Sequence, residues 1–242
     1  MPDRNPIDAL MVNGAPNPPG REVRKPRTPD THIDLHSRLR RSTRAIHERV
    51  ERQMDLERVS TSIEAYSCIL EDMLRLHRPI ERTLSALVME TAGIDFEARR
   101  KVGWLIADLI DLGHDAAALQ QLRDFAPVPA PATPDEALGV LYVLEGSSLG
   151  GQVILGRLGP ALGVGPLWAG RFFNGYGQAT GAMWRTFIAR LNVLGADPHT
   201  AAVIEASAIS TFAAFESCLA KAEASIAIKS PIHGTLKSGW SS

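Results

Sequence analysis

A histidine with a carboxylate one helical turn away is the pair in this chain whose types and spacing most favour chemistry. His47 precedes Glu51 by four residues within STRAIHERVE, residues 42–51, a stretch with helical periodicity. Residues four apart share a helix face, and a metal-binding imidazole is typically oriented by an acceptor on its other nitrogen. His47 is therefore a candidate metal or cofactor ligand. The alternative is a packed or solvated structural histidine.

Further polar residues line the same predicted helix face as His47. They follow at steps of three and four: His36, Arg40 and Thr43. Arg40 precedes His47 by seven residues, about 10 Å along the axis at ~1.5 Å per residue. A flat ligand bound through its centre at His47 would thus place acidic groups near Arg40. His77, on the apolar seam of the next predicted helix, is interpreted as a core histidine and is the rival ligand.

A second unusual stretch is LEGSSLGGQVILG, residues 144–156, which is otherwise apolar and helical. Glycine inside a helix costs about 1 kcal/mol relative to alanine, so bare backbone is expected to serve a purpose here. Gly146 and Gly150 share a face, Gly151 widens it, and Ser147 and Ser148 add small polar side chains. A planar macrocycle could lie on this face. Close packing of another helix is the alternative.

The composition is that of a soluble globular protein. The chain has 242 residues, a net charge of −1 and two cysteines. Nothing in it indicates a nucleic-acid partner, and no uncharged apolar run reaches the ~18 residues of a membrane span. The first residues lack the apolar core of a signal peptide, and the few cysteines favour a reducing cytoplasm. Glu-x-x-His, H-E-x-x-H, C-x-x-C, P-loop and GxGxxG motifs are absent.

The periodicity predicts an all-α protein with one domain at residues 31–228. A disordered, proline-rich tail is expected at 1–30, as a spacer or an over-long start, and a flexible tail at 229–242. Asp30 or Thr31 is expected to cap the first helix, and Pro79 to bend the second without ending it. Residues 159–170 are expected to be irregular. The remaining helices are expected near 60–87, 96–112, 115–123, 135–158, 178–194 and 198–226.

Three segments together resemble the haem oxygenases, most closely the bacterial branch associated with bacteriophytochromes. They are STRAIHERVE (42–51), YVLEGSSLGGQVI (142–154) and FFNGYGQATGAMWRTF (172–187), in the order found in that family. Each segment is weak evidence alone, but together with the helical patterning they are specific. The resemblance extends over residues 31–225.

The resemblance implies that haem is both cofactor and substrate. His47 matches the proximal histidine that binds the iron, and Glu51 matches an acidic position that orients it. Gly146, Gly150 and Gly151 match the distal helix, whose kink brings bare backbone to the other haem face, where oxygen reacts. The implied products are biliverdin, CO and ferrous iron. The electrons come from a separate reductase or ferredoxin, and a bacteriophytochrome is a possible recipient of the biliverdin.

Cations for the haem propionates are also implied by the resemblance. Arg40 and Arg190 match basic positions of the family, and Arg185 and Tyr176 are further candidates. For each arginine the alternative is an ordinary surface charge.

One position departs from the family pattern. Many members carry an aspartate on the distal helix, where this chain has Ser147. Glu145 is nearby but is expected to point elsewhere. The departure leaves the proton route and the cleaved position open, and it motivates a haem carrier or sensor without ring opening as the second hypothesis. A non-haem protein of the same architecture, such as a thiamin-degrading or quinone-cofactor type, is the third.

Overall fold

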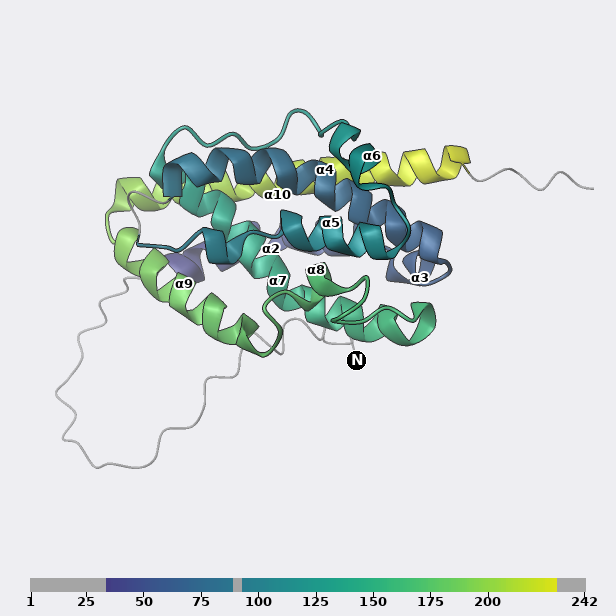
Figure 1. Ribbon diagram of the computed structural model, residues 1–242. Helices are drawn as coiled ribbons and strands as arrows, with labels where there is room; N and C mark the ends of the chain where they lie inside the picture. Colours follow the sequence, from purple (N-terminus) through teal and green to yellow (C-terminus); the bar gives the residue numbers. More distant parts are fainter. Residues whose placement is uncertain (1–33, 89–92, 230–242) are drawn as a thin grey trace, which may run out of the picture.

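Helices make up all the regular elements in the part of the chain that the structure describes. This computed structural model describes residues 34–88 and 93–229. The expected tail at 1–30 lies outside the described residues, as does all of the expected tail at 229–242 except Lys229, which ends α10. The all-α prediction is confirmed (Figure 1). The elements are α2 (Leu35–Gln53), α3 (Leu56–Val59), α4 (Ile63–Val88), the 3₁₀ turn η1 (Glu97–Arg99), α5 (Val102–Asp111), α6 (Ala116–Gln121), α7 (Pro134–Leu162), α8 (Arg171–Asn174), the 3₁₀ turn η2 (Gly177–Ala179), α9 (Thr180–Leu194) and α10 (Pro198–Lys229).

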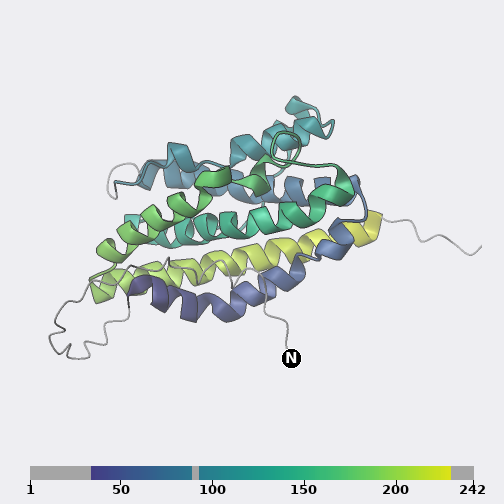
Figure 2. The ribbon, with the colours of Figure 1, turned by 90° about the horizontal axis from the view of Figure 1, so that it is seen from below.

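Three long helices run side by side, with α10 between α2 and α7 (Figure 2). Gly139 permits the close crossing of α7 and α10, because a Cβ there would lie 2.4 Å from the carbonyl oxygen of Ile204. Ser207 adds a hydrogen bond from its hydroxyl to the carbonyl oxygen of Glu136, at 2.7 Å. This tight contact fixes α7 relative to α10, and α2 packs against α10.

Helix α4 covers another side of the core and packs on α5, α7 and α10. Its apolar residues recur at helical spacing and are buried, including Tyr66, Leu70, Ile80 and Leu84. Pro79 lies inside the helix without ending it. Proline has no N–H to donate to the carbonyl oxygen of Arg75 four residues earlier, and that oxygen accepts the backbone N–H of Phe125 instead, at 3.1 Å.

Several boundaries differ from the sequence prediction. Helix α2 begins after Asp34, whose carboxylate accepts the backbone N–H of Ser37 at 2.9 Å, and not after Asp30 or Thr31. The helix expected at 96–112 is divided, because Arg100 is extended between η1 and α5. Helix α7 continues into the stretch expected to be irregular and ends at Gly163, a residue with φ of +71°.

Among the described residues, two helices pass the length and composition criteria for a membrane span. They are α7, with 61% of its apolar window buried, and Pro198–Ala220 of α10, with 39% buried. The two pack against each other. Core helices of soluble proteins pass the same criteria, so this is weak evidence for a membrane segment.

Candidate functional site

His47 lies on α2 with one ring nitrogen turned towards Glu51. The distance from its Nδ1 to Oε1 of Glu51 is 3.6 Å, and 37% of the side chain is exposed. Its ring meets Phe212 of α10 edge to face, with 5.5 Å between centroids. Because Nδ1 is the nitrogen nearest the carboxylate, Nε2 is the nitrogen left to bind a metal.

The surroundings of His47 suit a metal that is already coordinated by a macrocycle better than they suit a bare metal ion. Among the described residues no group of three or more His, Cys, Asp or Glu side chains comes together to hold a metal ion. A single imidazole is a weak site for a bare ion, whereas it is a common axial ligand for the iron of a macrocycle.

A cavity of about 90 Å³ lies between α2 and α7, next to the His47 face of α2. Val50 and Met54, three and seven residues after His47, contribute its α2 wall, and Ser147, Ser148 and Gly151 contribute to its α7 wall. The other lining residues come from α4, α7, α8 and α10 and from the residue before α5: Met73, His77, Lys101, Ile154, Phe172, Phe173, Phe215 and Leu219. The structure therefore brings residues of all three predicted segments to one cavity.

The glycines of α7 have different neighbours. A Cβ at Gly151 would lie 2.6 Å from the carbonyl oxygen of Phe173, so this glycine also serves close packing of α8, as the alternative interpretation expected. Gly146 faces the ring of Trp184 of α9, 3.7 Å from where a Cβ would lie. Gly150 is half-buried in the same helix. The described helix is continuous here, and its predicted kink stays a prediction.

The predicted propionate cations lie on two adjacent helices. Arg40 is on α2, and Arg185 and Arg190 are on α9; all three are exposed. The two helices are in contact, and the backbone N–H of His36 donates to Oδ1 of Asn192 at 3.0 Å. The packing thus places all three cations on one pair of helices.

Thr43 is buried on α2, away from solvent. Its hydroxyl donates to the carbonyl oxygen of Leu39 at 2.7 Å. It lies beside Tyr142 of α7, whose pKa rises to about 12, mainly because the phenol is buried. Thr43 therefore contributes to the contact between α2 and α7.

Tyr176 belongs to a buried charge cluster that the sequence did not predict. Its hydroxyl donates to Oε1 of Glu145 at 2.7 Å, and Nζ of Lys101 donates to the same oxygen at 2.8 Å. Arg99 pairs with the other carboxylate oxygen. Burial, together with the adjacent carboxylate, raises the pKa of Tyr176. Glu145 thus points away from the cavity, as expected.

His77 is fully buried on α4 and lines the cavity. Neither ring nitrogen has a hydrogen-bond partner among the described residues. Burial, helped by the nearby Lys101, lowers the pKa of His77 to about 3, so its ring is neutral at physiological pH. The sequence placed this residue correctly on the apolar seam but did not show that it faces the space beside His47.

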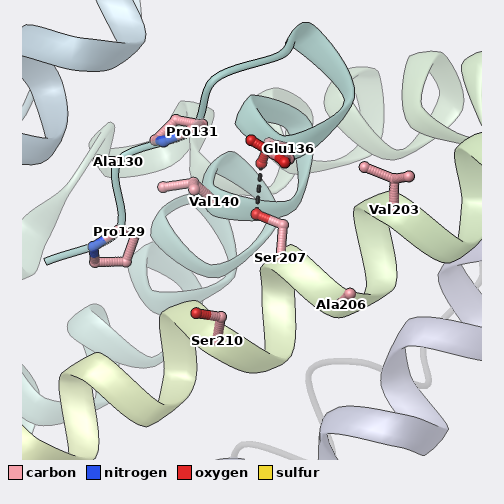
Figure 3. A pocket seen from close by; sticks show the side chains of 9 residues that line it. All are labelled: Pro129, Ala130, Pro131, Glu136, Val140, Val203, Ala206, Ser207 and Ser210. Atoms are coloured by element: carbon pink, nitrogen blue, oxygen red, sulfur yellow. Dashed lines mark hydrogen bonds between the residues drawn. The ribbon is translucent and has the colours of Figure 1, made fainter.

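A larger hollow, of about 380 Å³, lies between the loop at residues 129–131, α7 and α10 (Figure 3). Its one carboxylate, Glu136, accepts the backbone N–H of Ala132 at 2.6 Å. None of the predicted site residues lines this hollow. It therefore contributes nothing to the candidate site.

Comparisons with known proteins agree with the fold and indicate a family. The family model described as "Heme oxygenase" matches residues 33–221. A heme oxygenase of Xanthomonas campestris pv. campestris (strain 8004) is 35% identical over 158 residues, which is 65% of this chain and 90% of that protein.

Solved structures show the same fold at low identity. The heme oxygenase from Neisseria meningitidis, described with NO and CO bound, has a TM-score of 0.68 at 24% identity, covering 78% of this chain and 92% of that one. The heme oxygenase from Leptospira interrogans has a TM-score of 0.60 at 17% identity, covering 78% and 100%.

The fold and the sequence comparisons define a haem-binding oxidoreductase. The chain belongs to the haem oxygenase family. Members of this family bind haem as substrate and prosthetic group and degrade it with O2.

Proposed function

We propose that this protein cleaves haem to biliverdin, CO and ferrous iron in the cytoplasm, using O2 and electrons from a separate donor. The observation that carries the proposal is the pair His47–Glu51 on α2, next to a cavity whose opposite wall is the glycine-containing stretch of α7. The family membership supplies the reaction class, and the residues of this chain supply the means of binding.

The residues present fit haem. His47 offers an imidazole nitrogen, and most of the cavity wall is apolar, as a porphyrin requires. The cavity of about 90 Å³ is well below the roughly 300–1,000 Å³ of ligand pockets. Haem therefore enters only when the walls separate.

Most of the predicted site residues have a role in this proposal. His47 holds the iron and Glu51 orients its ring, while Arg40, Arg185 and Arg190 hold the propionates. Gly150 and Gly151 have no side chains, so the backbone of α7 can lie close to the haem ring. When bound, haem supplies the iron that activates oxygen and the ring that is oxidised. Tyr176 does not contact the haem directly in this proposal, because its hydroxyl already donates a hydrogen bond to Glu145. It helps to hold Glu145 in place.

The electron donor is a separate ferredoxin or reductase in this proposal, since the sequence has no flavin or iron–sulfur motif. A bacteriophytochrome is the proposed recipient of the biliverdin. Resemblance of the three sequence segments to the phytochrome-associated branch supports this partner.

A haem carrier or sensor is the second candidate function. The observation that favours it is Ser147, an exposed hydroxyl where many family members have an aspartate. Its hydroxyl donates to the carbonyl oxygen of Leu144 at 2.8 Å, so it is engaged with its own helix.

An absorbance time course tests the proposal. The purified protein receives one equivalent of hemin and then ascorbate or a ferredoxin system in air. We expect the Soret band to decay while the red absorbance of biliverdin grows, and the His47→Ala variant to lose both changes. His114→Ala, a half-buried histidine distant in sequence, is the matched control and keeps both. A Soret band that forms and persists under reductant supports the carrier or sensor, and no Soret band at all contradicts haem binding.

A further inference from the structure

The cavity between α2 and α7 has four polar lining residues, and three have no donor to offer. Ser147 and Ser148 both donate their hydroxyl hydrogens to the carbonyl oxygen of Leu144, at 2.8 and 3.3 Å. These bonds belong to the helix itself. Both serines therefore present lone pairs, and no hydrogen, to the cavity.

Lys101 also has no spare donor. Its ammonium group has three hydrogens, and Nζ has three partners: Glu145 Oε1 at 2.8 Å, the carbonyl oxygen of Arg99 at 3.2 Å and the hydroxyl of Tyr176 at 3.2 Å. Redirecting one of them would break a buried ion-pair cluster. Lys101 is thus held in that cluster.

His77 is the remaining polar residue, and its side chain is fully buried. A neutral imidazole carries one N–H donor and one acceptor nitrogen. Neither has a hydrogen-bond partner among the described residues. The ring is fixed by edge-to-face contacts with Phe172 at 5.3 Å and Phe215 at 5.9 Å between centroids, so it cannot leave the cavity wall without disturbing the core.

The nearest carboxylate does not satisfy His77. Oε1 of Glu81 is 4.0 Å from Nδ1, which is too long for a hydrogen bond. That oxygen instead accepts the backbone N–H groups of Lys101 at 2.7 Å and Val102 at 3.1 Å. A buried N–H without an acceptor is unfavourable, so its position beside a cavity indicates an acceptor that binds there.

We propose that His77 is the hydrogen-bond donor of the haem cavity, a positioning residue that holds an acceptor ligand on the haem from the α4 wall. It supplies from α4 the polar contact that Ser147 does not offer from α7. The proposal rests on the haem site proposed above. It goes beyond that site because none of the three segments that resemble the family contains His77.

Fluoride binding to the ferric haem complex tests this proposal without turnover. Fluoride is an anion that accepts hydrogen bonds, so its affinity reports a donor near the iron. In His77→Leu we expect fluoride to bind about tenfold more weakly, the effect of one hydrogen bond to a charged acceptor. CO, a poor acceptor, is expected to bind the ferrous complex with nearly unchanged affinity. His77→Gln, which keeps an N–H donor, is expected to recover part of the fluoride affinity.

Tyr66→Phe is the matched control on the same helix. Tyr66 is also buried, but its hydroxyl donates to the carbonyl oxygen of Ala169 at 2.6 Å and it does not line the cavity. This variant is expected to bind fluoride like the unmodified protein. Far-UV circular dichroism and a hemin titration of each variant precede the ligand measurements.

Four outcomes would overturn the proposal. Unchanged fluoride affinity in His77→Leu makes His77 a core residue only. Equal loss of fluoride and CO affinity shows a general disturbance of the pocket. Stronger fluoride binding, with loss of a low-spin ferric spectrum, makes His77 an iron ligand rather than a donor. Failure of the unmodified protein to bind hemin removes the proposed function as well, whereas the first three outcomes leave it standing.

Discussion

Lys101 and Glu145 form an ion pair inside the protein, with Nζ 2.8 Å from Oε1 and both side chains almost fully buried. Lys101 immediately precedes α5, and Glu145 lies on α7, one residue before Gly146. The pair, with Arg99 on the second carboxylate oxygen, ties the start of α5 to the cavity-lining part of α7. These buried ion pairs hold the cavity-lining part of α7 in place.

Glu145→Gln is expected to destabilise the fold by about 3–5 kcal/mol, because it leaves two buried cations, Arg99 and Lys101, without a counter-charge. Urea unfolding followed by circular dichroism measures the difference. Glu205→Gln is the matched control, since Glu205 pairs with the partly exposed Arg38; it is expected to cost about 0–1 kcal/mol. Similar costs for the two variants would contradict the role of the buried pair.

Glu51→Ala is expected to weaken hemin binding about 10–100-fold, because a carboxylate that orients a ligating imidazole contributes that much to metal affinity. A Soret titration measures it. Glu48→Ala, which removes the exposed i,i+4 partner of Arg44 on the same helix, is the control and is expected to leave the affinity unchanged. Equal affinities in both variants would show that Glu51 does not orient His47.

Gly151→Ala is expected to destabilise the protein by about 1–3 kcal/mol, because the new Cβ would lie 2.6 Å from a backbone oxygen of Phe173 that cannot turn aside. Gly156→Ala, on the same helix, meets nothing within 4 Å and is expected to stabilise it by about 1 kcal/mol. Thermal unfolding of both variants measures whether each substitution lowers or raises the stability. A stabilising Gly151→Ala would show that α8 does not pack this closely.

The buried His77 is expected to make stability fall as the pH falls. Its pKa is about 3 in the folded protein and 6.5 in the unfolded chain, so between these values the unfolded chain binds one more proton. The free energy of unfolding therefore rises with pH by up to about 1.4 kcal/mol per unit in this window. His77→Gln is expected to lose this part of the slope, about 2 kcal/mol between pH 4.5 and 6.5. Urea unfolding at both values measures it, and parallel pH profiles would contradict the buried neutral state.

The local features of this protein follow from short stretches of sequence. The period of apolar residues predicts α2, α4 and α10. The cap of α7 is also a local feature, since the hydroxyl of Thr133 accepts the backbone N–H of Glu136. The i,i+4 spacing of His47 and Glu51 places them on one face, because side chains four residues apart must meet on a helix. These interactions depend only on residues within one or two turns.

Helix boundaries that depend on contacts between residues far apart in the sequence are not predicted from the sequence pattern. The helix expected at 96–112 divides at Arg100, where the backbone N–H groups of the next two residues are held by Glu81 of α4. In sequence, Arg99, Arg100 and Lys101 look like a solvated charged run, yet two of them are buried. Their partner Glu145 is more than 40 residues away, so no local pattern contains it.

The sequence by itself determined the helices, the His47–Glu51 pair and the resemblance that names haem. Only the tertiary structure decided which residues share the cavity. It showed that Gly151 packs on α8, that Tyr176 belongs to the Glu145 cluster, and that His77 faces the space beside α2. The physical reason is that helical periodicity fixes the face of each residue, whereas the neighbour of that face depends on how the helices pack.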